Sequence, residues 1–184
     1  MINKKELKLT HFIPGLVILI AFLLPYTEAM ETQYQWLFML AHYMLFIGGF
    51  LLLYNMIKGS PLLIVPSAFL VTFWHLPLFF NLAAAFTTFR VLNDVSFIVA
   101  GALAGIAAGK MKLTLKFSLL VLWMTVDTAF SIVFLLQNPA YTDIAYPFSP
   151  YTPAEEIGTA VLMWIVMSGI IAYVIGKFLR ELLF

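Results

Sequence analysis

Residues 34–57 read YQWLFMLAHYMLFIGGFLLLYNMI, and this stretch contains no Lys, Arg, Asp or Glu. A helix that crosses a bilayer needs about 20 mostly apolar residues, so the stretch is long enough. Tyr34 and Trp36 stand at its start, and these ring types are enriched where a helix enters the membrane interface. The stretch therefore predicts a membrane-spanning helix, with His42 as a lone imidazole inside it.

Five more stretches of the same character accompany this one, at roughly 9–26, 61–86, 89–109, 113–137 and 155–176. The whole chain of 184 residues is 63% hydrophobic and 10% charged, whereas the surface of a soluble domain needs about a quarter of its residues charged. We therefore expect an all-α integral membrane protein of the cell membrane, a multi-pass chain in contact with the lipid bilayer. Residues 1–184 would form one domain, a bundle of six transmembrane helices.

Nine of the ten Lys and Arg residues fall on one side of the membrane in this six-helix interpretation. They are Lys4, Lys5, Lys8, Lys58, Lys110, Lys112, Lys116, Lys177 and Arg180, and the exception is Arg90. By the positive-inside rule, this asymmetry predicts that both termini are cytoplasmic. The first apolar run is too long for a typical signal peptide and lacks a small-x-small cleavage site, so we expect it to be a retained helix.

Local signals predict details of several helices. Ser60-Pro61 is typical of a helix start, and Thr152-Pro-Ala-Glu155 combines an N-cap, a proline at the first helical position and a capping-box glutamate. Pro77 should bend its helix at His75, because proline removes a backbone hydrogen bond. Gly101-x-x-x-Gly105-x-x-x-Gly109 indicates a smooth helix face for close packing.

Several classes of function are excluded by what the sequence lacks. The net charge of +1 gives no electrostatic reason to expect nucleic acid as a partner. There is no cysteine, which excludes disulfides, thiolate metal sites and thiol catalysis. No Walker, HExxH or GxSxG sequence is present, so we do not expect an enzyme.

Ionisable side chains inside the membrane are the candidates for a functional site, because each is costly there unless it is paired. His42 lies about eight residues, and His75 about eleven, from the outer ends of their helices, so their depths agree within about 5 Å. Asp127 falls at nearly the same level, and Asp94 lies somewhat nearer the outside. Arg90 and Asp94 are four residues apart on one helix, which predicts a structural ion pair.

The two histidines allow two interpretations. Neutral imidazole suits copper, zinc and iron, so His42 and His75 are candidate ligands of copper or haem, with Asp127 as a further candidate metal ligand. Alternatively, the histidines form ordinary hydrogen bonds between helices. The external segment Asn138–Ala154 is equally open: a long loop without helical pattern is either functional or packing over the mouth of the bundle.

One part of the sequence resembles a known family. Leu37-Phe-Met-Leu-Ala-His42, Phe73-Trp-His75-Leu-Pro77-Leu-Phe and Val95-Ser-Phe-Ile-Val-Ala-Gly are similar to segments of the CtaG-type membrane proteins, which are linked to cytochrome c oxidase assembly. The chain also has the look of an uncharacterised archaeal membrane family distant from them. The resemblance covers roughly residues 36–110, and its most specific element is Trp74-His75-Leu76-Pro77. Where that family has a third histidine element, this chain has Arg90, Asn93 and Asp94.

The resemblance implies a respiratory-oxidase context. We therefore expect an assembly factor or accessory subunit that holds copper or haem through His42 and His75 on the outer side, with other membrane subunits of a terminal oxidase as partners. One alternative is a structural subunit of a membrane complex that binds no metal. The other is a small proton-coupled transporter using Asp127 and the histidines, although no inverted repeat is evident.

Overall fold

Helices make up 81% of the chain, and no strand occurs in residues 9–54 and 56–183, the part that the computed structural model describes. The expected all-α fold is therefore confirmed. Three of the expected cytoplasmic cations, Lys4, Lys5 and Lys8, lie outside the described residues.

Four helices are each long and apolar enough to cross a membrane: α3 (Gln35–Leu53), α6 (Thr87–Ala108), α7 (Leu113–Leu135) and α8 (Pro153–Leu183). The chain is accordingly a multi-pass membrane protein. α8 is longer at both ends than the expected 155–176. Its start follows the predicted capping box, because the backbone N–H of Thr152 donates to the Glu155 carboxylate at 2.8 Å.

The first expected helix is broken. α1 (Leu9–Phe22) is followed by the short α2 (Pro25–Glu31), and the two are bent by 61°. The expectation of one helix over 9–26 followed by a loop is wrong at its end. Leu24 takes an extended conformation (φ −68°, ψ 137°), as residues before proline prefer, and Pro25 then opens a new helix at its first position.

The third expected helix is also broken, at the histidine. A 3₁₀ turn, η2 (Pro61–Leu63), leads into α4 (Ile64–Trp74), and α5 (Pro77–Ala85) follows at a bend of 72°. The Ser60 side chain caps the start by accepting from the N–H of Leu62, as predicted. The bend predicted from Pro77 is confirmed, although it is a complete break in which Leu76 is extended.

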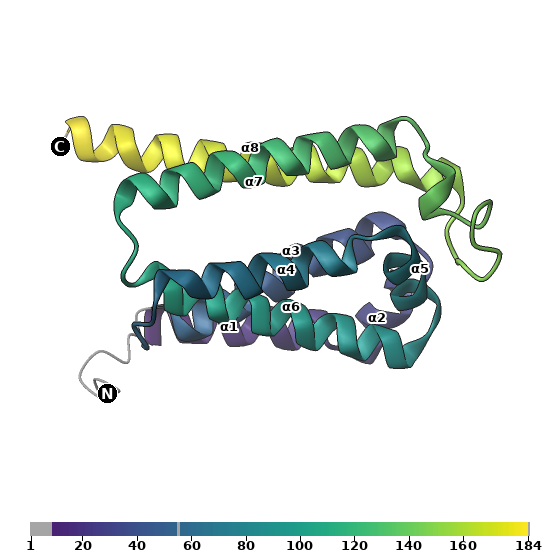
Figure 1. Ribbon diagram of the computed structural model, residues 1–184, viewed down its shortest axis with the longest axis horizontal. Helices are drawn as coiled ribbons and strands as arrows, with labels where there is room; N and C mark the ends of the chain where they lie inside the picture. The colour runs from purple at the N-terminus through teal and green to yellow at the C-terminus, as the bar shows by residue number, and fades with distance from the viewer. Residues whose placement is uncertain (1–8, 55, 184) are drawn as a thin grey trace.

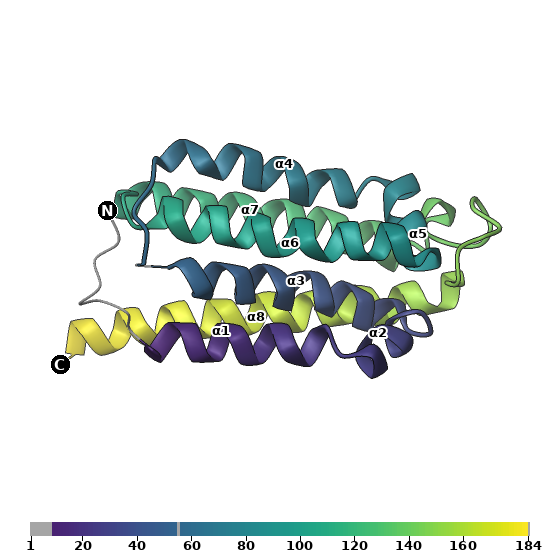
Figure 2. The same cartoon turned by 90° about the horizontal axis from the view of Figure 1, so that it is seen from below.

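The long helices lie side by side, and the two short ones gather at one end of the bundle (Figures 1 and 2). α3 packs on α1, α6 and α8, while α7 packs mainly on α8. α1 begins and α8 ends at the same end of the bundle, and α2, α5 and the segment before α8, which includes η3 (Pro139–Tyr141), lie at the opposite end (Figure 1). We call that opposite end the loop end. The fully buried Phe38, Phe80, Phe134 and Tyr151 belong to one apolar cluster of the core.

Close approach of α3 and α6 depends on glycine. A Cβ atom on Gly101 would collide with the backbone carbonyl of Phe46, one on Gly105 with that of Phe50, and one on Gly49 with that of Ile98. The smooth face predicted on α6 is therefore confirmed for Gly101 and Gly105, with Gly49 as its counterpart on α3. This crossing sets the distance between the backbones that carry His42 and its neighbours on α6.

Candidate functional site

His42 lies in the middle of α3, with 1% of its surface exposed. Its Nε2 is 3.1 Å from Oδ1 of Asn93 on α6, and Nδ1 has no hydrogen-bond partner among the described residues. An amide oxygen only accepts, so Nε2 carries the proton and Nδ1 keeps its lone pair. The ring stacks on Phe97 at 4.2 Å between centroids. His42 therefore holds a buried, unpartnered acceptor nitrogen inside an aromatic cluster.

His75 caps the C-terminus of α4, directly before the break. Its backbone N–H bonds the carbonyl of Thr72, so the Val71 carbonyl is free to accept from Nδ1 of the His75 ring at 2.7 Å. A carbonyl only accepts, which places the ring proton on Nδ1 and leaves the lone pair on Nε2. The break thus determines the protonated nitrogen of this second histidine.

The two imidazole rings lie edge to face, with 5.4 Å between their centroids. The expected proximity of His42 and His75 is confirmed; their role as ligands stays a prediction. Phe97 contacts both rings, and Phe130 of α7 lies 5.2 Å from His75. Each histidine donates one hydrogen bond and keeps one nitrogen unprotonated, which is the usual state of a metal-binding histidine whose other nitrogen is held by an oxygen.

Asp127 lies elsewhere on α7, with the Tyr43 hydroxyl 2.7 and 2.9 Å from its two carboxyl oxygens. The structure does not bring it together with the histidines: no group of three or more His, Asp or Glu side chains able to hold a metal ion occurs within the described residues. Thr125 and Thr128 bond to Val121 and Met167 instead of Asp127. The two imidazoles are therefore the candidate donors that the structure places together.

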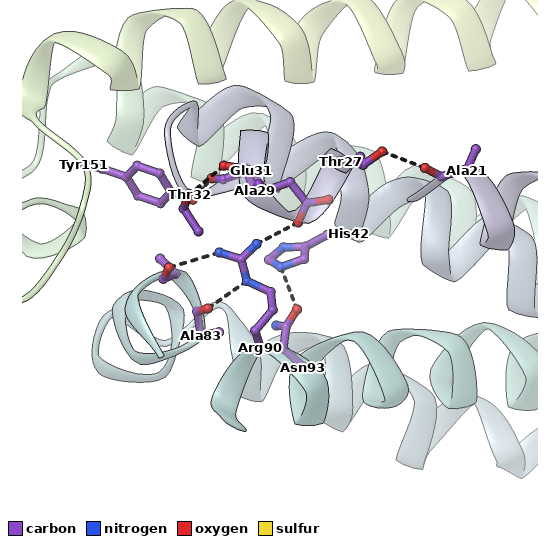
Figure 3. Close-up of polar contacts among 11 residues, drawn as sticks. Ala21, Thr27, Ala29, Glu31, Thr32, His42, Ala83, Arg90, Asn93 and Tyr151 are labelled. Carbon is purple, nitrogen blue, oxygen red and sulfur yellow. Dashed lines mark hydrogen bonds and ion pairs between the residues drawn. The ribbon is translucent and has the colours of Figure 1, made fainter. Parts of the chain in front are cut away.

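The ion pair predicted between Arg90 and Asp94 is wrong. Arg90 pairs with Glu31 at the end of α2, at 2.9 Å, and both side chains are almost fully buried (Figure 3). Its other nitrogens donate to the carbonyls of Ala83 and Ala84, at the C-terminal end of α5. The guanidinium is held by these three partners, and Oδ1 of Asp94 is buried without a hydrogen-bond partner among the described residues.

Arg90 thus joins the two short helices that follow the breaks, α2 through Glu31 and α5 through its last carbonyls. The guanidinium carbon also lies 4.5 Å above the ring of Phe38, and Phe38 in turn contacts His42 at 4.4 Å. Figure 3 shows Glu31, Arg90, His42 and Asn93 gathered in one place between the helices. The histidine pair is therefore bordered on the loop end by a buried ion pair of opposite charges.

Side chains from the segment after α7 close the loop end over the breaks. The hydroxyl of Tyr141 donates to the backbone carbonyl of His75 at 3.0 Å, and that of Tyr151 to the carbonyl of Glu31 at 2.6 Å. Asn81 of α5 donates to the carbonyl of Ala140. Segment 138–152 therefore satisfies a carbonyl at the break at His75 and another at the C-terminal end of α2, which supports the packing interpretation of this loop.

Both tyrosines remain donors at ordinary pH. Burial raises the pKa of the Tyr141 phenol to about 12, and the negative charge of Glu156 adds to the effect. Burial also raises the pKa of Tyr151. Because a phenol donates only while it is protonated, raised pKa values keep these two bonds intact across the physiological range.

Several residues of this region are not evident from sequence reasoning. The sequence marks Asn93 only as a departure from a histidine pattern, and it does not single out Glu31, Tyr141 or Tyr151. Pro25 is a usable signal for a new helix start, and that helix carries Glu31. Glu156 is fully buried, and neither of its carboxyl oxygens has a hydrogen-bond partner among the described residues.

The fold and its buried polar residues define a class: an all-helical, multi-pass membrane protein with a buried pair of histidines and a buried Arg–Glu ion pair. The model of one family, described as "Protein of unknown function (DUF1404)", matches residues 13–181. The chain belongs to this family. No curated protein and no solved structure matches the chain.

Proposed function

We propose that the protein binds a single copper ion between His42 and His75 and serves a respiratory oxidase as an assembly factor or accessory subunit. The observation that carries the proposal is the pair of imidazoles at 5.4 Å, one of them with a buried nitrogen that has no partner. A buried polar atom without a hydrogen bond costs free energy, so its retention in the core calls for a reason. A metal ion bound at that nitrogen supplies one.

The donor set fits copper. Imidazole nitrogen is a good copper ligand, and both rings are held in one tautomer by an oxygen acceptor, as is usual around metal-bound histidines. Two protein donors leave coordination positions of the ion open, because copper sites commonly use three or four ligands. Open positions suit an ion that is handed on to another protein.

A haem fits this geometry less well. Axial ligation by two histidines places the porphyrin plane between the rings, whereas here His42 is stacked on Phe97 at 4.2 Å and Phe38 lies at 4.4 Å. Phe130 lies beside His75 at 5.2 Å. A macrocycle would have to displace these packed aromatic rings, while a single ion would not.

The oxidase context is supported by the resemblance of Trp74-His75-Leu76-Pro77 and its flanking segments to the CtaG-type proteins. The element that carries this resemblance coincides with the broken helix at the site, where Pro77 opens α5 and His75 ends α4. The partner would be a terminal oxidase or a related respiratory complex in the cell membrane. The outer half of the bundle would face it.

The test is the metal content of the protein purified in detergent. We expect copper, or uptake of one Cu(I) ion per chain in competition with a chelating probe, and no Soret band in the absorption spectrum. A Soret band would show that the bound group is a haem and not a copper ion. Purified protein that contains neither copper nor haem and takes up no Cu(I) would contradict the proposal. The alternative of a structural subunit that binds no metal would then remain.

We also propose six spans with both termini cytoplasmic, each bent pair counting as one span. An even number of spans is supported by the position of the beginning of α1 and the end of α8 at one end of the bundle (Figure 1). The connections at that same end carry Lys58, Lys110 and Lys112, and Lys116 lies in the first turn of α7, as the positive-inside rule requires of a cytoplasmic side.

This topology predicts the accessibility of tags. In intact cells, a tag at either terminus should be unreactive toward a membrane-impermeant reagent, whereas a tag inserted at Asp143–Ala145, in the exposed part of the external loop, should react. Permeabilised cells, in which all tags should react, serve as the control. Reaction of only one terminus in intact cells would mean an odd number of spans and would contradict the proposed topology.

A further inference from the structure

Asn93 is a buried asparagine on α6 whose side chain makes one hydrogen bond, to His42, within the described residues (Figure 3). The side chain is completely buried, and its Nδ2 has no partner. Asparagine at such a position is costly, since an unsatisfied buried donor destabilises a protein. Its oxygen therefore serves a purpose that an apolar side chain could not serve, and that purpose concerns His42.

A neutral imidazole has two tautomers, and the hydrogen bond at one nitrogen decides which is present. His42 has one hydrogen-bonding neighbour, Oδ1 of Asn93, at its Nε2. Without that oxygen the proton could reside on either ring nitrogen, because the ring makes no other hydrogen bond among the described residues and is surrounded by the aromatic rings of Phe38, Phe80, Phe97 and His75. Asn93 thus selects the Nε2–H form.

We propose that Asn93 is a positioning residue that holds His42 in the Nε2–H tautomer and so makes Nδ1 the atom presented to a ligand. That the ligand is copper rests on the proposed function. His75 presents the opposite nitrogen, Nε2, because the Val71 carbonyl holds its Nδ1–H. The site is therefore asymmetric, with one Nδ1 and one Nε2 donor, and one tautomer depends on a side chain while the other depends on the backbone.

The first test needs no metal. In ¹⁵N spectra of histidine-labelled protein at neutral pH, His42 should show an unprotonated Nδ1 and a protonated Nε2, assigned by the loss of its signals in His42→Ala. In Asn93→Leu, which has the same branched shape and no acceptor, the signals should shift toward a mixture of tautomers. A protonated Nδ1 in the wild-type protein, or an unchanged spectrum in Asn93→Leu, would overturn the proposal.

The second test measures Cu(I) affinity. Asn93→Leu should weaken binding by about 10–100-fold, the usual effect of losing an oxygen that supports a metal-bound histidine. Asn93→Asp, which keeps an acceptor oxygen, should retain wild-type affinity or exceed it. Ser67→Ala is the matched control, because it removes another buried hydrogen bond to α6, to the Ala100 carbonyl, and should leave affinity unchanged.

The two tests separate failure of this proposal from failure of the proposed function. If wild-type protein binds no Cu(I) but shows the Nε2–H tautomer that is lost in Asn93→Leu, copper binding is refuted and the positioning role of Asn93 stands. If wild-type protein binds Cu(I) and Asn93→Leu binds it equally well, copper binding stands and the role of Asn93 is refuted. Should Asn93→Leu fail to fold, the wild-type spectrum and the Asn93→Asp variant still decide.

Discussion

Replacing His75 or His42 with alanine is expected to abolish copper binding while the protein still inserts into the membrane. Each change removes one of two nitrogen donors, and a single imidazole cannot hold the ion against a competing chelator. Insertion should survive, because removing one polar side chain from a long apolar segment favours transfer into lipid. The measurement is Cu(I) uptake by the purified variants at equal protein concentration.

The matched control is His11→Ala. His11 lies on α1, and its ring packs against Tyr54 and not against His42 or His75. Its loss should therefore leave Cu(I) uptake unchanged. In a purely structural interpretation, the His42–Asn93 bond contributes about 0.6 kcal/mol, the average for such bonds in membranes, and no ion is lost. Full Cu(I) uptake by folded His75→Ala would contradict ligation by this residue.

Arg90→Met should cause the largest loss of stability, about 3–5 kcal/mol in the free energy of unfolding, as is usual when one partner of a buried ion pair is removed. The change leaves the Glu31 carboxylate buried without its cation and removes the donors that the Ala83 and Ala84 carbonyls use. Both short helices lose an anchor at once. Denaturation in mixed micelles would measure the loss.

Lys110→Met controls for the loss of a cation as such, since Lys110 is exposed and its replacement should change stability by no more than about 0.5 kcal/mol. The double variant Arg90→Met with Glu31→Gln should recover part of the loss, because it no longer buries an uncompensated charge. Wild-type stability in Arg90→Met would show that the ion pair does not hold the short helices.

The parts of the fold that the sequence predicted correctly depend on interactions within one segment. Hydropathy marks the long helices α3, α6, α7 and α8 because lipid requires each segment to satisfy its own backbone hydrogen bonds. The bend at Pro77 and the caps at Ser60 and Thr152 follow from the geometry of neighbouring residues. The smooth face of Gly101 and Gly105 follows from helical periodicity alone.

The errors arise where a local rule competes with a distant partner. Spacing favoured pairing of Arg90 with Asp94, one turn away, but the structure places Glu31 against it from 59 residues away. The break before Pro25 carries Glu31 inward, and a charge from another helix then meets the guanidinium in the core. A rule for pairs on one helix cannot anticipate this, because it contains no information about which helices pack together.

The sequence by itself therefore determined the class of protein, the approximate limits of its long helices, the bend at His75 and the two histidines worth attention. These features depend on composition and on residues a few positions apart. Only the tertiary structure decided that the imidazoles lie edge to face, that Asn93 and the Val71 carbonyl bond their rings, and that Tyr141 and Tyr151 close the loop end. Such contacts join helices far apart in the chain, and their geometry depends on the crossing of α3 with α6, which side-chain packing sets.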